Sequence, residues 1–331
     1  MDIELLEERA RIIRKIRSFF DCRNYLETDT PILAPDLIPE SCLEVFESRR
    51  IAPPESRRPP QPCWLVPSPE IWMKRLIARH RRSLYQICKC FRNGESTGRI
   101  HSPEFTMLEY YTMDADYLDS LRITEELFAF LTGAVPAGKT DLRPPFLRIT
   151  MEEAFSRWAG FNLYEAAGGG TLEAEARRLG LNPPPGLDGG ALYDLIFIHR
   201  VEPALPKDRP VVLLDYPAFV PCLARKHAGG KSRERWELYF RGIELANCYS
   251  EETNAEEVRR CFEAETETVI SASGGSALVK KGAMVPHAVD LDYWRIFENF
   301  PRCSGTALGV DRLIMAMTGR STIDGVLPFP M

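Results

Sequence analysis

The sequence predicts an α+β protein with a mainly antiparallel sheet flanked by helices. Residues 83–92 and 105–111 have strand patterns on either side of a polar, glycine-containing loop, which is typical of an antiparallel hairpin. Residues 211–215 and 235–245 also have strand patterns. Because strands follow one another as hairpins instead of alternating with helices, the pattern argues against a doubly wound parallel sheet.

Helices are predicted where apolar residues recur with helical spacing. Residues 4–22 form an amphipathic pattern, followed by an extended segment that ends near Pro31. Ser68 and Pro69 precede Glu70, which predicts a helix start with Ser68 as N-cap and a helix running to about residue 79. Further helices are expected over 117–131, 171–179 and 256–270, and residues 305–317 are expected as a glycine-rich strand end that leads into a buried helix.

We expect one domain over residues 1–331, with a decorated middle region at about 133–205. Residues 133–145 and 165–190 are rich in glycine and proline. Residues 48–62 are rich in proline and arginine, and we expect a surface loop there.

Composition excludes several classes of function. The 331 residues carry a net charge of -5, which does not favour a nucleic-acid-binding surface. No apolar run approaches the roughly 18 residues of a membrane span, and the acidic start of the chain does not have the pattern of a signal peptide. Nine cysteines without disulfide spacing suit reduced thiols in a cytoplasmic protein.

The first candidate site is the turn between the two hairpin strands. Arg92 precedes the loop, and His101 and Phe105 follow it, which suits a nucleotide: a guanidinium can hold phosphate and an aromatic ring can stack on a base. Seven Lys or Arg and no acid lie between Ile71 and Gly94, either as an anion-attracting region or as a solvated basic face. Phe105 shares a strand face with Glu109, so that face is expected to line a pocket and not only the core.

Two further segments carry candidate ligands. Gly305 to Arg312 combines small residues with an arginine in the first turn of a helix, which suits close approach of a nucleotide, although such glycines are commonly used for packing. Glu237 and Glu244 offer the oxygen ligands that Mg²⁺ prefers. Their odd separation places them on opposite faces of one regular strand, so a shared metal requires a bulge near Gly242.

Together these segments resemble the three motifs of class II aminoacyl-tRNA synthetases. The helix before Pro31 resembles motif 1, residues 91–105 resemble motif 2, and residues 305–312 resemble motif 3. The strings S-P-E-I-W-M-K-R-L, H-S-P-E-F-T-M-L-E-Y-Y, G-I-E-L-A-N and A-L-G-V-D-R-L are similar to the lysyl-tRNA synthetase branch. Within that branch, the pattern is similar to the elongation factor P lysine ligases, which are truncated paralogues without an anticodon-binding domain.

The resemblance implies roles for individual residues. Arg92 and Arg312 would be the catalytic residues, with Arg92 holding the α-phosphate and Arg312 stacking on the adenine together with Phe105. ATP contacts would come from Arg92, Asn93, Glu95, His101, Ser102, Phe105, Glu244, Leu245, Gly305 and Arg312. A lysine-type substrate would contact Ser68, Glu70, Glu109, Tyr111, Asn247, Glu251 and Ala307. Mg²⁺ would bind Glu237 and Glu244.

The implied reaction is ATP-dependent activation of (R)-β-lysine or a lysine analogue, with elongation factor P as the acceptor protein. The implied enzyme is a homodimer, with neither tRNA nor a membrane as partner. Ala307, where lysyl-tRNA synthetases have glycine, favours the ligase. Ser102 and Cys248-Tyr249 depart from the ligase pattern. Two alternatives stay open: aminoacylation of tRNA by this chain, and a non-catalytic paralogue that senses amino acids.

Overall fold

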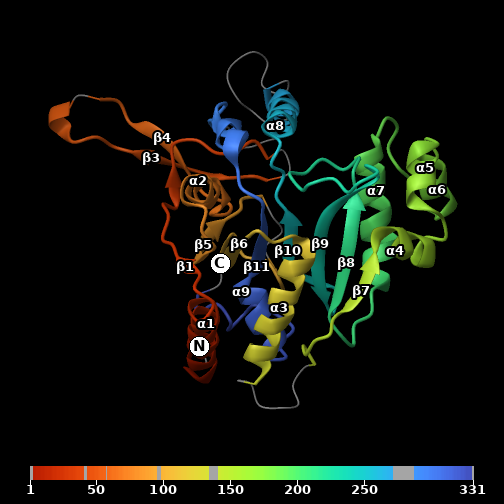
Figure 1. Ribbon diagram of the computed structural model, residues 1–331, viewed down its shortest axis with the longest axis horizontal. Helices are drawn as coiled ribbons and strands as arrows, with labels where there is room; N and C mark the ends of the chain where they lie inside the picture. The colour runs from red at the N-terminus through yellow and green to blue at the C-terminus, as the bar shows by residue number, and fades with distance from the viewer. Residues whose placement is uncertain are drawn as a thin grey trace.

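The centre of the molecule is an eight-stranded sheet (Figure 1). The computed structural model describes residues 3–40, 43–56, 58–94, 98–133, 141–270 and 287–329. Across the sheet the strands are β1 (Leu26–Glu27), β5 (Leu84–Phe91), β6 (Glu104–Met113), β11 (Cys303–Gly309), β10 (Ile243–Ser250), β9 (Ser232–Phe240), β8 (Val211–Pro217) and β7 (Leu147–Thr150). Among the described strands only the outermost pairs, β1–β5 and β7–β8, are parallel, so the predicted antiparallel β5–β6 hairpin is confirmed.

Three helices cover one face of this sheet. They are α1 (Ile3–Asp21), α3 (Tyr117–Thr132) and α9 (Val310–Met317). Figure 1 shows α3 and α9 lying against the central strands. Leu108 and Tyr110 of β6 and Leu308 of β11 point into this layer and are fully buried. Because strand side chains alternate, the residues between them project from the opposite face.

The opposite face is bordered by a second helical group. It consists of α2 (Glu70–His80), α8 (Ala255–Ile270) and a 3₁₀ segment, η4 (Tyr293–Asn299). These elements share a core in which Phe262, Tyr293 and Phe297 are buried. The predicted capping of α2 by Ser68 is wrong: Pro69 occupies the N-cap position and no side chain caps it. With proline there, the helix starts on a residue whose φ is already restricted by its ring.

The proline- and arginine-rich segment is not a simple loop. β3 (Phe46–Arg50) and β4 (Gln61–Leu65) pair in an antiparallel ladder and form a second sheet with β2 (Leu33–Ala34). Figure 1 shows this hairpin projecting from the body of the molecule. The loop prediction for 48–62 is therefore wrong at both ends, because the ladder continues to Arg50 and Gln61.

The middle region forms a helical layer with its own core. It contains α4 (Met151–Trp158), α5 (Leu163–Gly168), α6 (Leu172–Arg178) and α7 (Gly189–Ile196). The helix predicted at 171–179 is confirmed as α6. Phe155 and Tyr193 stack with ring centroids 5.4 Å apart and pack with residues of β8 and β9. The helical layer therefore packs against the end of the sheet that contains β7, β8 and β9.

The strand predicted over 235–245 is two strands. β9 ends at Phe240 and β10 begins at Ile243, and these two residues pair across the turn. Arg241 and Gly242 both have positive φ, 53° and 74°. Two successive positive φ values define the tight turn that suits the twist of an antiparallel hairpin. The correction places the two predicted metal ligands on neighbouring strands.

No helix in the described part of the chain is long and apolar enough to cross a bilayer. The eight cysteines described there carry free thiols. This agrees with the expectation of reduced thiols.

A buried ion pair holds the first helix to the site end of the sheet. Arg9 of α1 donates to Asp311 of α9 at 2.6 Å and to the Thr106 hydroxyl of β6 at 2.8 Å. The Thr106 amide donates to the second Asp311 oxygen at 2.7 Å. The network fixes the start of α9 against β6 and so fixes the backbone beside Arg312.

Arg9→Met should therefore destabilise the protein. Removing one partner of a buried ion pair leaves an uncompensated charge and costs about 3–5 kcal/mol. Urea denaturation would measure the change in free energy of unfolding. Arg122→Met is the matched control, because the Arg122 side chain is 65% exposed and pairs with a partly exposed Asp119, and such a surface pair contributes about 0–1 kcal/mol. Equal effects of both variants would contradict this account.

Candidate active site

The site is built by the register of four neighbouring strands, β6, β11, β10 and β9. Glu109 pairs with Ala307, Ala307 with Asn247, and Asn247 with Glu237. Residues directly opposite one another in a ladder share a face. These four residues therefore form one row across the sheet, on the face that α1, α3 and α9 leave uncovered.

A second row lies two residues further along each strand. Tyr111 pairs with Gly305, Gly305 with Tyr249, and Tyr249 with Arg235. Glu251 follows two residues beyond Tyr249 on the chain. On this face of the sheet, the Glu109 row therefore lies in the middle and the Tyr111 row lies nearer to α2.

A bulge in β10 adds Glu244 to this face. The β9–β10 register shifts between Glu244 and Ala246, and Glu244 pairs with Tyr239. Since Tyr239 lies two residues from Glu237, the shift puts both carboxylates on one face. A bulge was the predicted condition for a shared metal. It lies just beyond the turn at Gly242.

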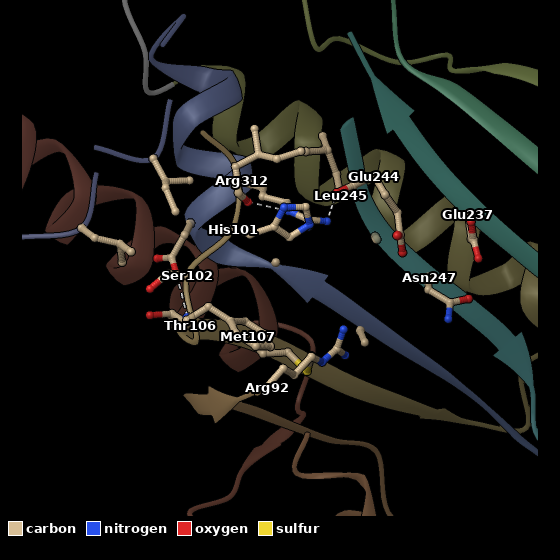
Figure 2. Close-up of a pocket in the computed structure, with 18 of the residues that line it drawn as sticks. Arg92, His101, Ser102, Thr106, Met107, Glu237, Glu244, Leu245, Asn247 and Arg312 are labelled. Atoms are coloured by element: carbon tan, nitrogen blue, oxygen red, sulfur yellow. Dashed lines mark hydrogen bonds between the residues drawn. The ribbon is translucent and has the colours of Figure 1, made fainter. Parts of the chain in front are cut away.

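A cavity of about 360 Å³ opens over these rows. Arg92 from the end of β5 and Arg312 from the first turn of α9 both line it, although they are far apart in the chain. Figure 2 shows Arg312 beside His101 at one end, Arg92 at another, and Glu244, Glu237 and Asn247 along the teal strands. Other lining residues include Ser102, Phe105, Met107, Leu245, Ala307 and Gly309.

Both arginines are held in place by protein contacts. Arg312 donates to the carbonyl oxygens of Ile100 at 3.3 Å and Glu244 at 2.9 Å. The Arg92 guanidinium lies 5.3 Å from the centre of the Phe105 ring. Preorganised guanidinium groups stabilise phosphate charge without moving during the reaction. The cavity therefore has the chemistry of a nucleoside polyphosphate site.

The two carboxylates fit a divalent cation. Glu237 accepts hydrogen bonds from Arg235 at 2.5 Å and from the Tyr239 hydroxyl at 2.6 Å. Burial raises the pKa of Glu244 to about 7, and nearby Glu237 contributes to the same shift. The Asn247 Oδ1 atom is buried without a hydrogen-bond partner. Two carboxylates and an amide oxygen are hard ligands of the kind Mg²⁺ takes together with phosphate oxygens.

An acidic group lies at the α2 end of the same face. Glu109 accepts a 2.7 Å hydrogen bond from Tyr111, and burial raises the pKa of Glu109 well above its usual range. Lys74 of α2 contacts Glu70 at 2.5 Å and Glu251 at 2.8 Å. Burial raises the pKa of Glu251 to about 7 although Lys74 opposes the shift. Several carboxylates in a partly desolvated pocket suit a ligand with ammonium groups.

Glycine at 305 is required by close contacts in this acidic group. A Cβ atom there would lie 2.6 Å from Glu251 Oε1 and 2.6 Å from Tyr111 Cε1. Gly305 is not part of the cavity lining between the two arginines. Its position therefore favours a role in the acidic pocket over the ATP contact implied by the resemblance.

Among the described residues, five other predicted site residues are absent from the lining of the two cavities: Ser68, Asn93, Glu109, Tyr111 and Glu251, of which the last three belong to the buried acidic group. Asn93 donates to the Val45 carbonyl at 3.2 Å and accepts from the Gly94 amide at 2.9 Å, so its side chain organises the local backbone. Glu95 lies outside the described residues.

The sequence interpretation missed four residues at the site. Lys74, Tyr249 and Arg235 contact the predicted acids directly. Glu40 lines the space next to Glu70, and burial raises its pKa to about 7. Only Lys74 had a usable signal, because it follows Glu70 by four positions on a predicted helix, the spacing of an ion pair.

A wider hollow of about 1250 Å³ adjoins the cavity between the two arginines. Arg92, Arg235 and Asn247 line both spaces. The hollow continues past Tyr249 to residues of α5, α6, α7 and α8. The two spaces therefore meet at these three shared residues.

Comparison with known proteins defines the class. The model of the class II tRNA synthetases for aspartate, lysine and asparagine matches residues 3–331. The chain therefore belongs to this class II family. The predicted fold class, a mainly antiparallel sheet flanked by helices, is confirmed.

Similar proteins of nearly the same length carry the name elongation factor P–(R)-β-lysine ligase. One from Vibrio atlanticus is 34% identical over 332 residues, covering 99% of this chain and 96% of the relative. One from Photobacterium profundum is 34% identical with the same coverage. One from Avibacterium paragallinarum is 32% identical, covering 99% and 95%.

Gly305→Ala should lower stability because the new methyl group would clash with Glu251 and Tyr111. Overpacking a closed site costs about 1–3 kcal/mol. Gly168→Ala is the control, because no atom lies within 4 Å of the position that its new methyl group would take, and alanine is favoured in a helix by about 1 kcal/mol. Denaturant unfolding compares the two. A Gly305→Ala protein as stable as wild type would contradict the close packing inferred here.

Proposed function

We propose that this protein activates a lysine-type amino acid with ATP and transfers the acyl group to an amine. The observation that carries the proposal is the placement of Arg92 and Arg312 on one cavity with the Glu70, Glu109 and Glu251 group beside it. A polyphosphate site next to an acidic pocket suits ATP and a diamino acid bound together.

The first step joins the two substrates. The amino acid carboxylate attacks the α-phosphorus of ATP, the bond to the β-phosphate breaks, and pyrophosphate leaves. No protein nucleophile is needed, because positioning and cationic stabilisation lower the barrier. Arg92 would hold the carboxylate and α-phosphate, and Arg312 would bind near the base and the outer phosphates. Mg²⁺ held by Glu237 and Glu244 would neutralise charge on the leaving phosphates.

The second step consumes the adenylate. An acceptor amine attacks the activated carbonyl carbon, AMP leaves, and an amide forms with loss of a proton. We place the acceptor in the wide hollow beside Asn247 and Tyr249, because that space adjoins the cavity at the row where the carbonyl would lie. Following the names of the relatives, we propose elongation factor P as acceptor and (R)-β-lysine as the amino acid.

Ala307 is the residue that we propose distinguishes the amino acid. It lies between Glu109 and Asn247 in the middle row. A methyl group at a close-packed substrate site shifts selectivity by about 1–3 kcal/mol. We further propose a homodimeric, cytoplasmic enzyme that carries a catalytic domain without an anticodon-binding domain and does not use tRNA.

Amino-acid-dependent exchange of pyrophosphate into ATP tests the first step. At least one member of a panel of lysine isomers should support exchange with the wild-type enzyme. Arg92→Met and Arg312→Met should each lower kcat/KM by about 10²-fold or more, since each removes preorganised charge stabilisation. Arg122→Met, which lies on α3 away from the cavity, should behave as wild type. No exchange with any isomer would favour a non-catalytic sensor.

Transfer is tested by mass spectrometry of the acceptor. Elongation factor P incubated with enzyme, ATP and (R)-β-lysine should gain one acyl group on a lysine side chain. A parallel incubation with tRNA should leave the tRNA unacylated. Charged tRNA together with unmodified elongation factor P would replace the proposed acceptor.

The affinity for the amino acid should rise with pH. The pKa of Glu251 is about 7, so its carboxyl is protonated below that pH and can pair with an ammonium above it. KM for the lysine-type substrate should therefore fall about tenfold between pH 6 and pH 8, following the ionised fraction of one group. Glu251→Gln should abolish this titration. A pH-independent KM in the wild-type enzyme would contradict the assignment.

A further inference from the structure

Lys74 is a buried cation inside the acidic pocket. It lies on α2, one turn after Glu70, and its side chain has no exposed surface. Its Nζ atom lies 2.5 Å from Glu70 Oε1 and 2.8 Å from Glu251 Oε2. The ammonium also lies 5.3 Å from the centre of the Tyr249 ring and 6.0 Å from that of Phe297.

Burying an ammonium group completely costs desolvation free energy, so it is a poor way to stabilise a core. Desolvation of two buried charges can exceed their attraction, and apolar residues of similar size often stabilise as well or better. The aromatic rings around Lys74 would accept an apolar side chain. Its presence between two carboxylates therefore points to a role in their charge and position.

The lysine contacts one oxygen of each carboxylate and leaves the others for a ligand. Glu251 Oε1 is buried without a hydrogen-bond partner. It faces the position where Gly305 lacks a side chain, since a Cβ there would lie 2.6 Å away. Glu251 Oε1 therefore keeps unused hydrogen-bonding capacity while Oε2 lies within ion-pair distance of Lys74.

The groups facing Glu251 explain why a cation is needed. From α2 these are Glu70 and Lys74, and the remaining groups are phenols and a thiol on β6, β10, η4 and β11: Tyr111, Tyr249, Tyr293 and Cys303. Lys74 is the cation that lowers the pKa of Glu251 among the described residues. Without it, like charge and burial would both favour the protonated acid.

We propose that Lys74 is a positioning residue that bridges Glu70 and Glu251 and holds their carboxyl groups at a fixed separation, so that each can bind one ammonium group of a diamino acid. This inference rests on the proposed function. In this proposal Lys74 sets the distance between the two ammonium-binding carboxyl groups but does not itself bind the substrate.

Lys74→Met tests the proposal, because methionine keeps most of the apolar stem and removes the charge. At pH 7 the KM for the lysine-type substrate should rise roughly fivefold or more, since an increase of one unit from a pKa of about 7 lowers the ionised fraction of Glu251 from about one half to about one tenth. The increase should shrink as the pH is raised to about 9, where the carboxyl ionises again. The KM for ATP, whose cavity does not include Lys74, should stay close to the wild-type value and shows that the variant is folded.

Two further variants separate positioning from simple structural support. Lys74→Arg retains the charge and should keep the pH profile of the wild type near neutrality. Lys89→Met is the matched control: its ion pair with Glu104 is about half exposed, and the variant should leave both KM values unchanged.

The outcomes distinguish this inference from the proposed function. Exchange activity in the wild type, with a Lys74→Met variant whose amino acid KM and pH profile match it, would overturn the role of Lys74 alone. Absence of amino-acid-dependent exchange in the wild type would overturn the proposed function instead. Loss of ATP binding together with amino acid binding in Lys74→Met would reduce Lys74 to a folding role.

Discussion

The cross-strand register of β6, β11, β10 and β9 is the constraint on which the site depends. It aligns Glu109, Ala307, Asn247 and Glu237 in one row, from segments that are far apart in the chain. A shift of one residue in any of these strands would turn its site residue into the helical layer. The apolar residues beneath, such as Leu108 and Leu308, oppose that shift because it would expose them to the polar face.

The two faces of the sheet therefore contribute differently, one to stability and the other to the site. The face under α1, α3 and α9 supplies apolar burial, while the other face holds buried acids that oppose folding when ionised. Three sets of contacts offset the free-energy cost of burying these acids. They are the Tyr111–Glu109 hydrogen bond, the Lys74 contacts with two carboxylates, and the Arg235–Glu237 pair. The Lys74 contacts leave Glu251 Oε1 without a hydrogen-bond partner. A cation that binds there relieves the repulsion among the remaining carboxylates, and this relief contributes to its affinity.

Local sequence patterns predicted much of this structure. Periodicity predicted α1, α3 and the β5–β6 hairpin, and the arginine–aromatic pattern around Arg92 and Phe105 led to the nucleotide cavity. The error at 235–245 arose because apolar and polar residues alternate on both sides of the turn, so the pattern alone does not interrupt the strand. Gly242 was the available turn signal, but Arg241 also adopts positive φ, which its residue type does not predict. Glu40 and Arg235 reach the site only through tertiary packing, which leaves no mark in the local sequence.

The most direct test is a crystal structure with a non-hydrolysable sulfamoyl analogue of lysyl adenylate. The account predicts the adenosine in the cavity between Phe105 and Arg312, the sulfamoyl group at Arg92, and the side-chain ammonium within ion-pair distance of Glu251 Oε1. An analogue bound away from both arginines, or with its amino groups turned away from the acidic group, would contradict the account.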